Sequence, residues 1–192
     1  MPKIIKKRSE SGKFSADGKE YIITDPRTPK PWVNYLTNGR YCTFMSHTGG
    51  GYTFWKDPFV NGITRWGPRL KSAALGREVY VLDKGEDDYW TINWEPVCRD
   101  YDSWECRVGL GYNLIKSERK EIGGSVLYFV PPDKDLEYWL IRIKNKSDEA
   151  RELEVFTGVE LSLGNIRSDL LSTELHELFN RVYEEEGGLY AE

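Results

Sequence analysis

The sequence predicts an all-β protein, a large antiparallel β-sandwich with at most one short helix. Apolar and polar residues alternate with a period of two over much of the chain, and this period is typical of half-buried strands. Clusters of glycine, proline, aspartate and asparagine separate these stretches at short intervals, as turns do in an antiparallel sandwich. A helical pattern of apolar residues occurs in one segment only, near residues 168–180.

The N-terminal half supplies the first candidate strands. Residues 18–24 ("GKEYIIT") and 40–46 ("RYCTFMS") are short segments rich in strand-forming residues. Residues 77–83 ("REVYVLD") and 88–94 ("DYWTINW") are joined by the turn-rich segment "KGED", and this order predicts a β-hairpin.

The C-terminal half continues in the same way. We predict strands at residues 105–115 ("ECRVGLGYNLI"), 124–130 ("GSVLYFV"), 137–145 ("EYWLIRIKN") and 151–161 ("RELEVFTGVEL"). Ser168 is the predicted N-cap of the short helix, and residues 179–191 ("FNRVYEEEGGLYA") return to strand and turn character. Since the last residues read as a turn followed by a new strand, we expect residues 1–192 to be one incomplete β-sandwich domain.

Composition limits the classes of function. A net charge of −4 with 30% charged residues gives no basic excess that would favour nucleic acid as a partner. No apolar run is long enough to span a membrane or to form a signal peptide. The three cysteines are an odd number without metal or redox spacing, so we expect free thiols in a reducing compartment and a cytoplasmic protein.

Motifs for several catalytic chemistries are missing. With only two histidines, a histidine-rich metal site is excluded, and no serine lies in a nucleophile elbow. The glycine-rich segment "HTGGGYT" lacks the lysine and the spacing of a phosphate-binding loop.

The segment "SHTGGGYTFWKDP", residues 46–58, places three consecutive glycines beside aromatic residues. One interpretation is a turn between two strands, with the aromatic side chains packed in the sandwich. The other is a backbone that must come close to another molecule, because glycine leaves room for such an approach. The residues alone leave both interpretations open.

An ordered series of motifs resembles one family. It comprises the segment from "EYIITDPRTPKPW" to "GGGYTFWKDP", then "ITRW", "INWEPV", "YDSWECRVGLGY", "LYFVPP" with "EYWLIRIKNKS", and "ELFNRVYEEEGGLYA". Together they resemble the N-terminal portion of the inverting disaccharide phosphorylases of glycoside hydrolase family 94, formerly glycosyltransferase family 36. The resemblance runs from about Tyr21 to Ala191.

The resemblance implies a β-sandwich of the supersandwich type, followed by a helical linker and an (α/α)6 barrel with a catalytic aspartate. Phosphate would attack the anomeric carbon with inversion, so no general base has to activate water. The catalytic barrel is not expected in this chain, and we therefore assign no catalytic residue and expect no activity from the chain alone. No cofactor is implied, and inorganic phosphate would be the co-substrate.

The implied partners are the catalytic barrel, in the same or a separate chain, a second copy in a homodimer, and a β-glucoside sugar. Because the unfinished sheet would leave an unpaired edge and apolar surface, we also expect the chain to associate. The alternative function is a stand-alone carbohydrate-binding or assembly module without catalysis.

The family's N-terminal loops approach the partner's active site, which suggests a substrate-binding role for the glycine segment. In this interpretation the glycine backbone passes close to the sugar, polar groups lie at the rim, and aromatic rings flank the approach. Arg65 would contact a sugar hydroxyl or, alternatively, pair with a carboxylate. The candidate substrate-binding residues are His47, Thr48, Gly49, Gly50, Gly51, Tyr52, Trp55 and Arg65.

Overall fold

The structure is a computed structural model that describes residues 11–65, 76–171 and 180–192. Within them the chain forms sixteen strands and one short helix, α1 (Ile166–Leu171). The strand pairings are antiparallel. The predicted all-β antiparallel fold is therefore confirmed. Among the described helices, none has the length and apolar character needed to cross a membrane.

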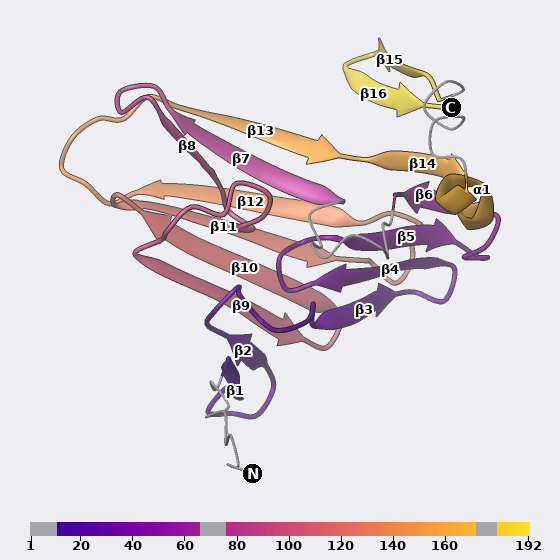
Figure 1. Ribbon diagram of the computed structural model, residues 1–192, viewed down its shortest axis with the longest axis horizontal. Helices are drawn as coiled ribbons and strands as arrows, with labels where there is room; N and C mark the ends of the chain where they lie inside the picture. Colours follow the sequence, from indigo (N-terminus) through magenta and orange to yellow (C-terminus); the bar gives the residue numbers. More distant parts are fainter. Residues whose placement is uncertain (1–10, 66–75, 172–179) are drawn as a thin grey trace, which may run out of the picture.

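The largest sheet has six strands and forms one layer of the sandwich (Figure 1). In spatial order its strands are β1 (Gly12–Phe14), β2 (Tyr21–Ile23), β9 (Ser103–Gly109), β10 (Tyr112–Arg119), β11 (Ile122–Phe129) and β12 (Tyr138–Asn145).

Two smaller sheets lie along one side of this layer (Figure 1). The first has the order β14 (Leu161–Gly164), β6 (Gly62–Thr64), β5 (Gly51–Trp55), β4 (Tyr41–Ser46) and β3 (Val33–Thr37). The second has the order β13 (Leu153–Val159), β7 (Arg77–Asp83) and β8 (Asp88–Thr91). A separate hairpin of β15 (Val182–Glu185) and β16 (Gly188–Ala191) follows near the C-terminus.

The core lies between the six-stranded sheet and the two smaller sheets. Strand register sets which side chains enter it: Ile115 of β10 pairs with Val126 of β11, and both side chains are fully buried. Val79 and Val81 of β7 face them in the same apolar cluster. Each such side chain stabilises the fold by roughly 1.5–3 kcal/mol relative to an exposed position.

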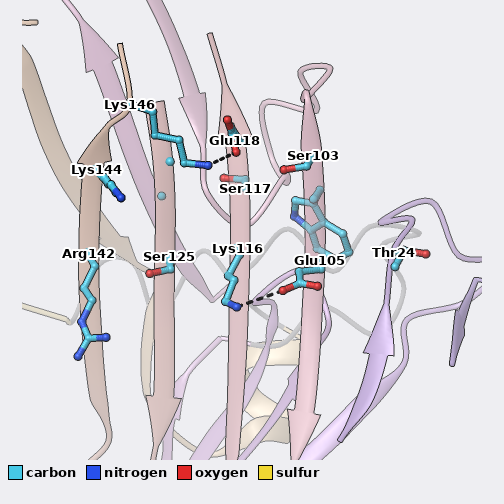
Figure 2. Close-up of a pocket in the computed structure, with 13 residues that line it drawn as sticks. Thr24, Ser103, Glu105, Lys116, Ser117, Glu118, Ser125, Arg142, Lys144 and Lys146 are labelled. Atoms are coloured by element: carbon cyan, nitrogen blue, oxygen red, sulfur yellow. Dashed lines mark hydrogen bonds and ion pairs between the residues drawn. The ribbon is translucent and has the colours of Figure 1, made fainter. Parts of the chain in front are cut away.

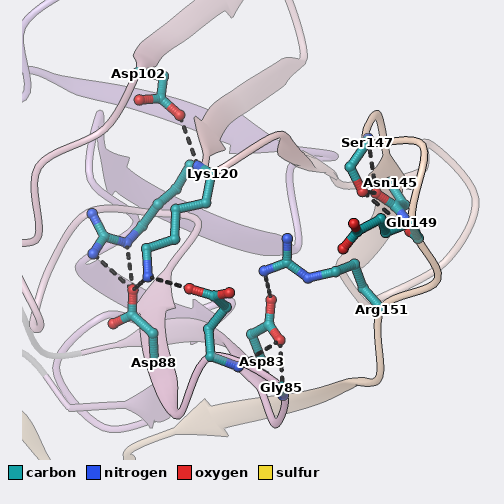
Figure 3. Close-up of polar contacts among 11 residues, drawn as sticks. Asp83, Gly85, Asp88, Asp102, Lys120, Asn145, Ser147, Glu149 and Arg151 are labelled. Carbon is teal, nitrogen blue, oxygen red and sulfur yellow. Dashed lines mark hydrogen bonds and ion pairs between the residues drawn. The ribbon is translucent and has the colours of Figure 1, made fainter.

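Charged contacts close one end of the sandwich (Figure 3). In the β7–β8 turn, Asp83 accepts the backbone N–H of Gly85 at 3.1 Å and also pairs with Arg151, which precedes β13. Lys120, in the β10–β11 turn, lies 3.3 Å from Asp88 of β8. The predicted hairpin around "KGED" is thus confirmed, and charged contacts join it to the segment before β13 in its own sheet and to the β10–β11 turn of the six-stranded sheet.

Two local predictions need correction. The segment 105–115 is not one strand, because a turn at Leu110 and Gly111 separates β9 from β10. Gly111 has a φ of +82°, which glycine adopts without steric cost. The cap of α1 is Asn165, whose side-chain oxygen accepts the Arg167 N–H at 2.8 Å, whereas Ser168 lies inside the helix. His176, which the sequence places in the helical segment 168–180 and which we interpret as a packed or surface histidine, lies outside the described residues.

Candidate functional site

The predicted substrate-binding residues lie along two neighbouring strands of the five-stranded sheet and the turn before them. His47, Thr48, Gly49 and Gly50 form the turn from β4 to β5. Gly51, Tyr52 and Trp55 belong to β5, and Arg65 follows β6 directly.

The three glycines are buried in this turn. Gly49 has a φ of +93° and Gly51 a φ of +152°, both in the region that side chains rarely adopt. A Cβ atom at Gly49 would lie 2.0 Å from Asn93 Nδ2, and one at Gly51 would lie 2.0 Å from the Phe44 carbonyl oxygen. Contacts inside the domain therefore require glycine at Gly49 and Gly51.

The residues that approach the glycine turn belong to the start of β7 and to the loop after β8. Asn93 donates its side-chain N–H to the Arg77 carbonyl oxygen at 3.1 Å and to the Tyr128 hydroxyl at 2.8 Å. A Cβ atom at Gly76 would lie 3.2 Å from the Gly51 nitrogen. The glycine turn thus packs backbone against backbone across two sheets, and the Gly49 N–H donates to the Ser46 carbonyl oxygen at 3.1 Å.

The other predicted side chains have partners within the domain. Tyr52 is 3% exposed, and its hydroxyl donates to the Pro58 carbonyl oxygen at 2.6 Å. The Trp55 indole N–H donates to Asp135 at 2.8 Å, while Lys56 Nζ lies 3.9 Å from the centre of the ring. Arg65 lies 3.9 Å from Glu160, as the structural alternative for this residue predicted.

His47 and Thr48 differ from the rest because they line a pocket of about 210 Å³. The loop between β2 and β3 forms one wall with Arg27 and Lys30, and the loop after β8 forms the other with Trp94 and Glu95. The Thr48 hydroxyl donates a hydrogen bond to Glu95 at 2.7 Å. This contact links the β4–β5 turn to the loop after β8.

The hydrogen bonds of His47 indicate its tautomer. Nδ1 accepts the Trp32 backbone N–H at 3.3 Å, so the proton of the neutral ring is on Nε2, which lies 2.9 Å from the Pro26 carbonyl oxygen. Burial lowers the pKa of His47, although both backbone contacts oppose this effect. His47 is therefore a neutral side chain that holds the Pro26 loop in place.

A second pocket of about 300 Å³ extends this one. The two pockets share Pro26, Arg27 and Trp94, so they form one groove between the β2–β3 loop and the loop after β8. Trp104 also lines the second pocket. Its side chain is 8% exposed, and its indole N–H has no hydrogen-bond partner in the described structure.

The groove carries groups that are suited to binding a polar ligand. Indole rings provide apolar faces with a polar edge, and the surrounding carboxylate and guanidinium groups are hydrogen-bonding partners for a polar ligand. No group of three or more metal-ligating side chains occurs in the described part of the chain. The sequence interpretation missed Trp94 and Glu95 as site residues, although "INWEPV" was one of the motifs that carried the resemblance.

Comparison with known proteins identifies the domain. Residues 19–192 match the family model "Glycosyl hydrolase 94, supersandwich domain". The chain belongs to this family. The supersandwich domain accounts for the all-β antiparallel architecture, and the resemblance to family 94 phosphorylases is confirmed.

Several curated relatives of this supersandwich domain are phosphorylases. The chain is 39% identical over 160 residues to N,N'-diacetylchitobiose phosphorylase of Vibrio proteolyticus, covering 82% of this chain and 20% of the relative. It is 31% identical over 154 residues to solabiose phosphorylase of Paenibacillus borealis, with coverages of 79% and 20%. It is 33% identical over 155 residues to 3-O-beta-D-glucopyranosyl-beta-D-glucuronide phosphorylase of the same organism, with coverages of 81% and 19%. The chain thus spans about a fifth of the length of these relatives.

Proposed function

We propose that this supersandwich domain is the N-terminal, non-catalytic part of an inverting glycoside phosphorylase. The complete enzyme would cleave a β-linked glucoside disaccharide or oligosaccharide with inorganic phosphate and release an α-sugar 1-phosphate. The observation that carries this proposal is the similarity to phosphorylases about five times longer than this chain. The catalytic barrel, a second copy and the sugar are the proposed partners, phosphate is the co-substrate, no cofactor is required, and the location is cytoplasmic.

The position of Glu78 supports a non-catalytic role for this domain. A general acid in a phosphorylase must carry a proton near neutral pH. Burial, with the nearby Glu160 as a second cause, raises the pKa of Glu78 to about 7. Yet Glu78 lies on β7 opposite Gly158 of β13 and lines neither pocket of the groove. We infer that the acid is supplied outside this chain.

The groove is the part of the domain that we assign to the substrate cleft. His47 and Thr48 keep the role expected from the sequence, with Trp94 and Glu95 added, while the glycines support them from within the fold. Trp94 follows β8 with a φ of +84° and is only partly buried. Its ring is the proposed contact for the apolar face of a sugar.

A variant pair tests this function in a polypeptide that carries the domain together with its catalytic part. The wild type should release sugar 1-phosphate, and Trp94→Ala should raise KM for the disaccharide about tenfold, which corresponds to about 1.4 kcal/mol of lost binding. Trp55→Ala is the matched control and should leave KM unchanged. Lys30→Ala, at an exposed groove position, provides a second variant if Trp94→Ala lowers the melting temperature.

The outcomes separate the two candidate functions. If Trp55→Ala changed KM while Trp94→Ala and Lys30→Ala left it unchanged, the substrate cleft would lie outside the groove. A wild-type polypeptide that binds the sugar without any phosphorolysis would instead favour the carbohydrate-binding module.

A further inference from the structure

A hollow lies over one end of the six-stranded sheet, on the face that points away from the core (Figure 2). Its volume is about 480 Å³, within the range of roughly 300–1,000 Å³ that small-molecule sites occupy. Two small residues of β11, Gly123 and Ser125, form its centre. Ser125 lies between Lys116 of β10 and Arg142 of β12 in the strand register, as Figure 2 shows. We call this space, with small residues at its centre and longer side chains around it, the β11 hollow.

The charged side chains that line the β11 hollow are of both signs, with basic ones in excess. The lining contains four basic side chains and two carboxylates: Lys116, Arg142, Lys144 and Lys146 against Glu105 and Glu118. Glu105 lies 3.2 Å from Lys116 and 2.8 Å from Arg107, which is outside the lining. Glu118 pairs with Lys146. Both carboxylates of the hollow are therefore already paired with basic neighbours.

The excess positive charge lies on β12. Arg142 and Lys144 are exposed and have no ion-pair partner among the residues that the structure describes. They are two residues apart on one strand, so both project from the same face of the sheet. The hydroxyl of Ser125, which is beside Arg142 in the register, has no hydrogen-bond partner in the described part of the chain either. Two cations and one hydroxyl are therefore available to a ligand.

These three groups fit a phosphate ester. The Arg142 guanidinium presents a planar set of N–H donors to phosphate oxygens, the Lys144 ammonium adds a point charge, and a serine hydroxyl donates one more hydrogen bond. A phosphate monoester carries about −1.5 to −2 charges at pH 7, which the two free cations balance.

The rest of the lining indicates what the phosphate is attached to. Glu118 and Ser103 offer acceptor oxygens on the β9–β10 side of the hollow, and a paired carboxylate keeps lone pairs for further donors. Trp104 is the single aromatic residue in the described lining, but it is 8% exposed and packs in the core cluster. A nucleobase would therefore find no ring to stack on, whereas the hydroxyl groups of a sugar would find acceptors.

We propose that the β11 hollow binds a phosphorylated sugar, with the phosphate on Arg142, Lys144 and Ser125 and the sugar hydroxyls toward Glu118 and Ser103. The basic side chains of the hollow line neither pocket of the groove, so this site is separate from the proposed substrate cleft. It gives the domain a ligand of its own, whatever reaction the complete enzyme performs, and the two proposals can fail separately.

Isothermal titration calorimetry of residues 1–192 with glucose 1-phosphate tests the proposal. The wild type should bind one equivalent, and Arg142→Gln should raise Kd at least about tenfold, because it removes a charged donor to the phosphate. Lys30→Gln is the matched control, since it removes the same charge at an exposed position of the groove, and it should leave Kd unchanged. Glucose and inorganic phosphate should each bind at least about tenfold more weakly than glucose 1-phosphate, because each lacks one half of the ligand.

Ser125→Leu provides the second variant. It keeps every charge but fills the centre of the hollow, so Kd should rise at least about tenfold, and circular dichroism melting establishes that the variants are folded. A wild type that does not bind glucose 1-phosphate, or that binds inorganic phosphate equally well, overturns the proposal. So does a Kd that Ser125→Leu leaves unchanged, or one that Lys30→Gln raises while Arg142→Gln does not.

Discussion

Arg77→Met is expected to destabilise the domain by about 3–5 kcal/mol, because it leaves a buried carboxylate without its counter-ion. The Arg77 side chain is fully buried and that of Glu137 is 9% exposed. Arg77 binds both oxygens of Glu137 and the hydroxyls of Thr43 and Thr53. The pair therefore joins β7, the segment before β12, and strands β4 and β5.

The exposed pair of Arg27 and Asp25, with side chains 67% and 47% exposed, offers the control. Arg27→Met should change the free energy of unfolding by no more than about 1 kcal/mol. Urea denaturation of the two variants measures both effects. Equal stabilities for Arg77→Met and Arg27→Met would contradict the assignment of Arg77 and Glu137 as the polar link between the sheets.

The pair of Arg77 and Glu137 also predicts that the free energy of unfolding depends on pH. Burial opposes the charged form of Glu137, but Arg77 outweighs it, so the pKa of Glu137 lies below its usual value. Stability from such a group is present above the unfolded-state pKa, near 4.3, and is lost as pH falls through the folded-state pKa. The wild type should therefore lose stability on acidification below about pH 4, and Glu137→Gln should lack this part of the loss.

Gly49→Ala is expected to destabilise the domain by about 3–5 kcal/mol, since it adds backbone strain and displaces a buried hydrogen-bonded side chain. The new Cβ would meet Asn93 Nδ2 at 2.0 Å, and Asn93 cannot move without losing its contacts with Arg77 and Tyr128.

Gly39→Ala isolates the backbone contribution. Gly39 has a φ of +89° with nothing within 4 Å of an added Cβ, so the substitution should cost only about 1 kcal/mol. Thermal melts of the two variants give the comparison. If Gly49→Ala melted like Gly39→Ala and instead raised the KM of the complete enzyme, the turn would be a ligand contact, as the cleft interpretation holds.

The strands were the most predictable part of the fold. Alternation identified 137–145, which contains β12, and the "KGED" turn identified the β7–β8 hairpin, because both signals are local. The turn inside 105–115 was missed although Gly109 and Gly111 flank Leu110, because an apolar residue at that position reads as strand, and Leu110 proves to be 97% exposed. The periodic pattern cannot distinguish a two-residue turn from a continuing strand when the turn carries an apolar side chain.

The site was less predictable because tertiary contacts create it. The glycine segment was recognised as unusual, but the atoms that require Gly49 belong to Asn93, which is distant in the sequence. Likewise, the groove forms only when the loops around Arg27 and Trp94 meet over His47. No local pattern in either loop indicates that contact.

The central claim, that this domain serves a phosphorylase without performing the chemistry, is tested most directly by a phosphorolysis assay of the purified chain. Residues 1–192, incubated with inorganic phosphate and β-linked glucose disaccharides, should release no sugar 1-phosphate, whereas the polypeptide extended through its catalytic part should release it. Phosphate-dependent release by residues 1–192 alone, abolished by Glu78→Gln, would contradict the claim and place the acid within this domain.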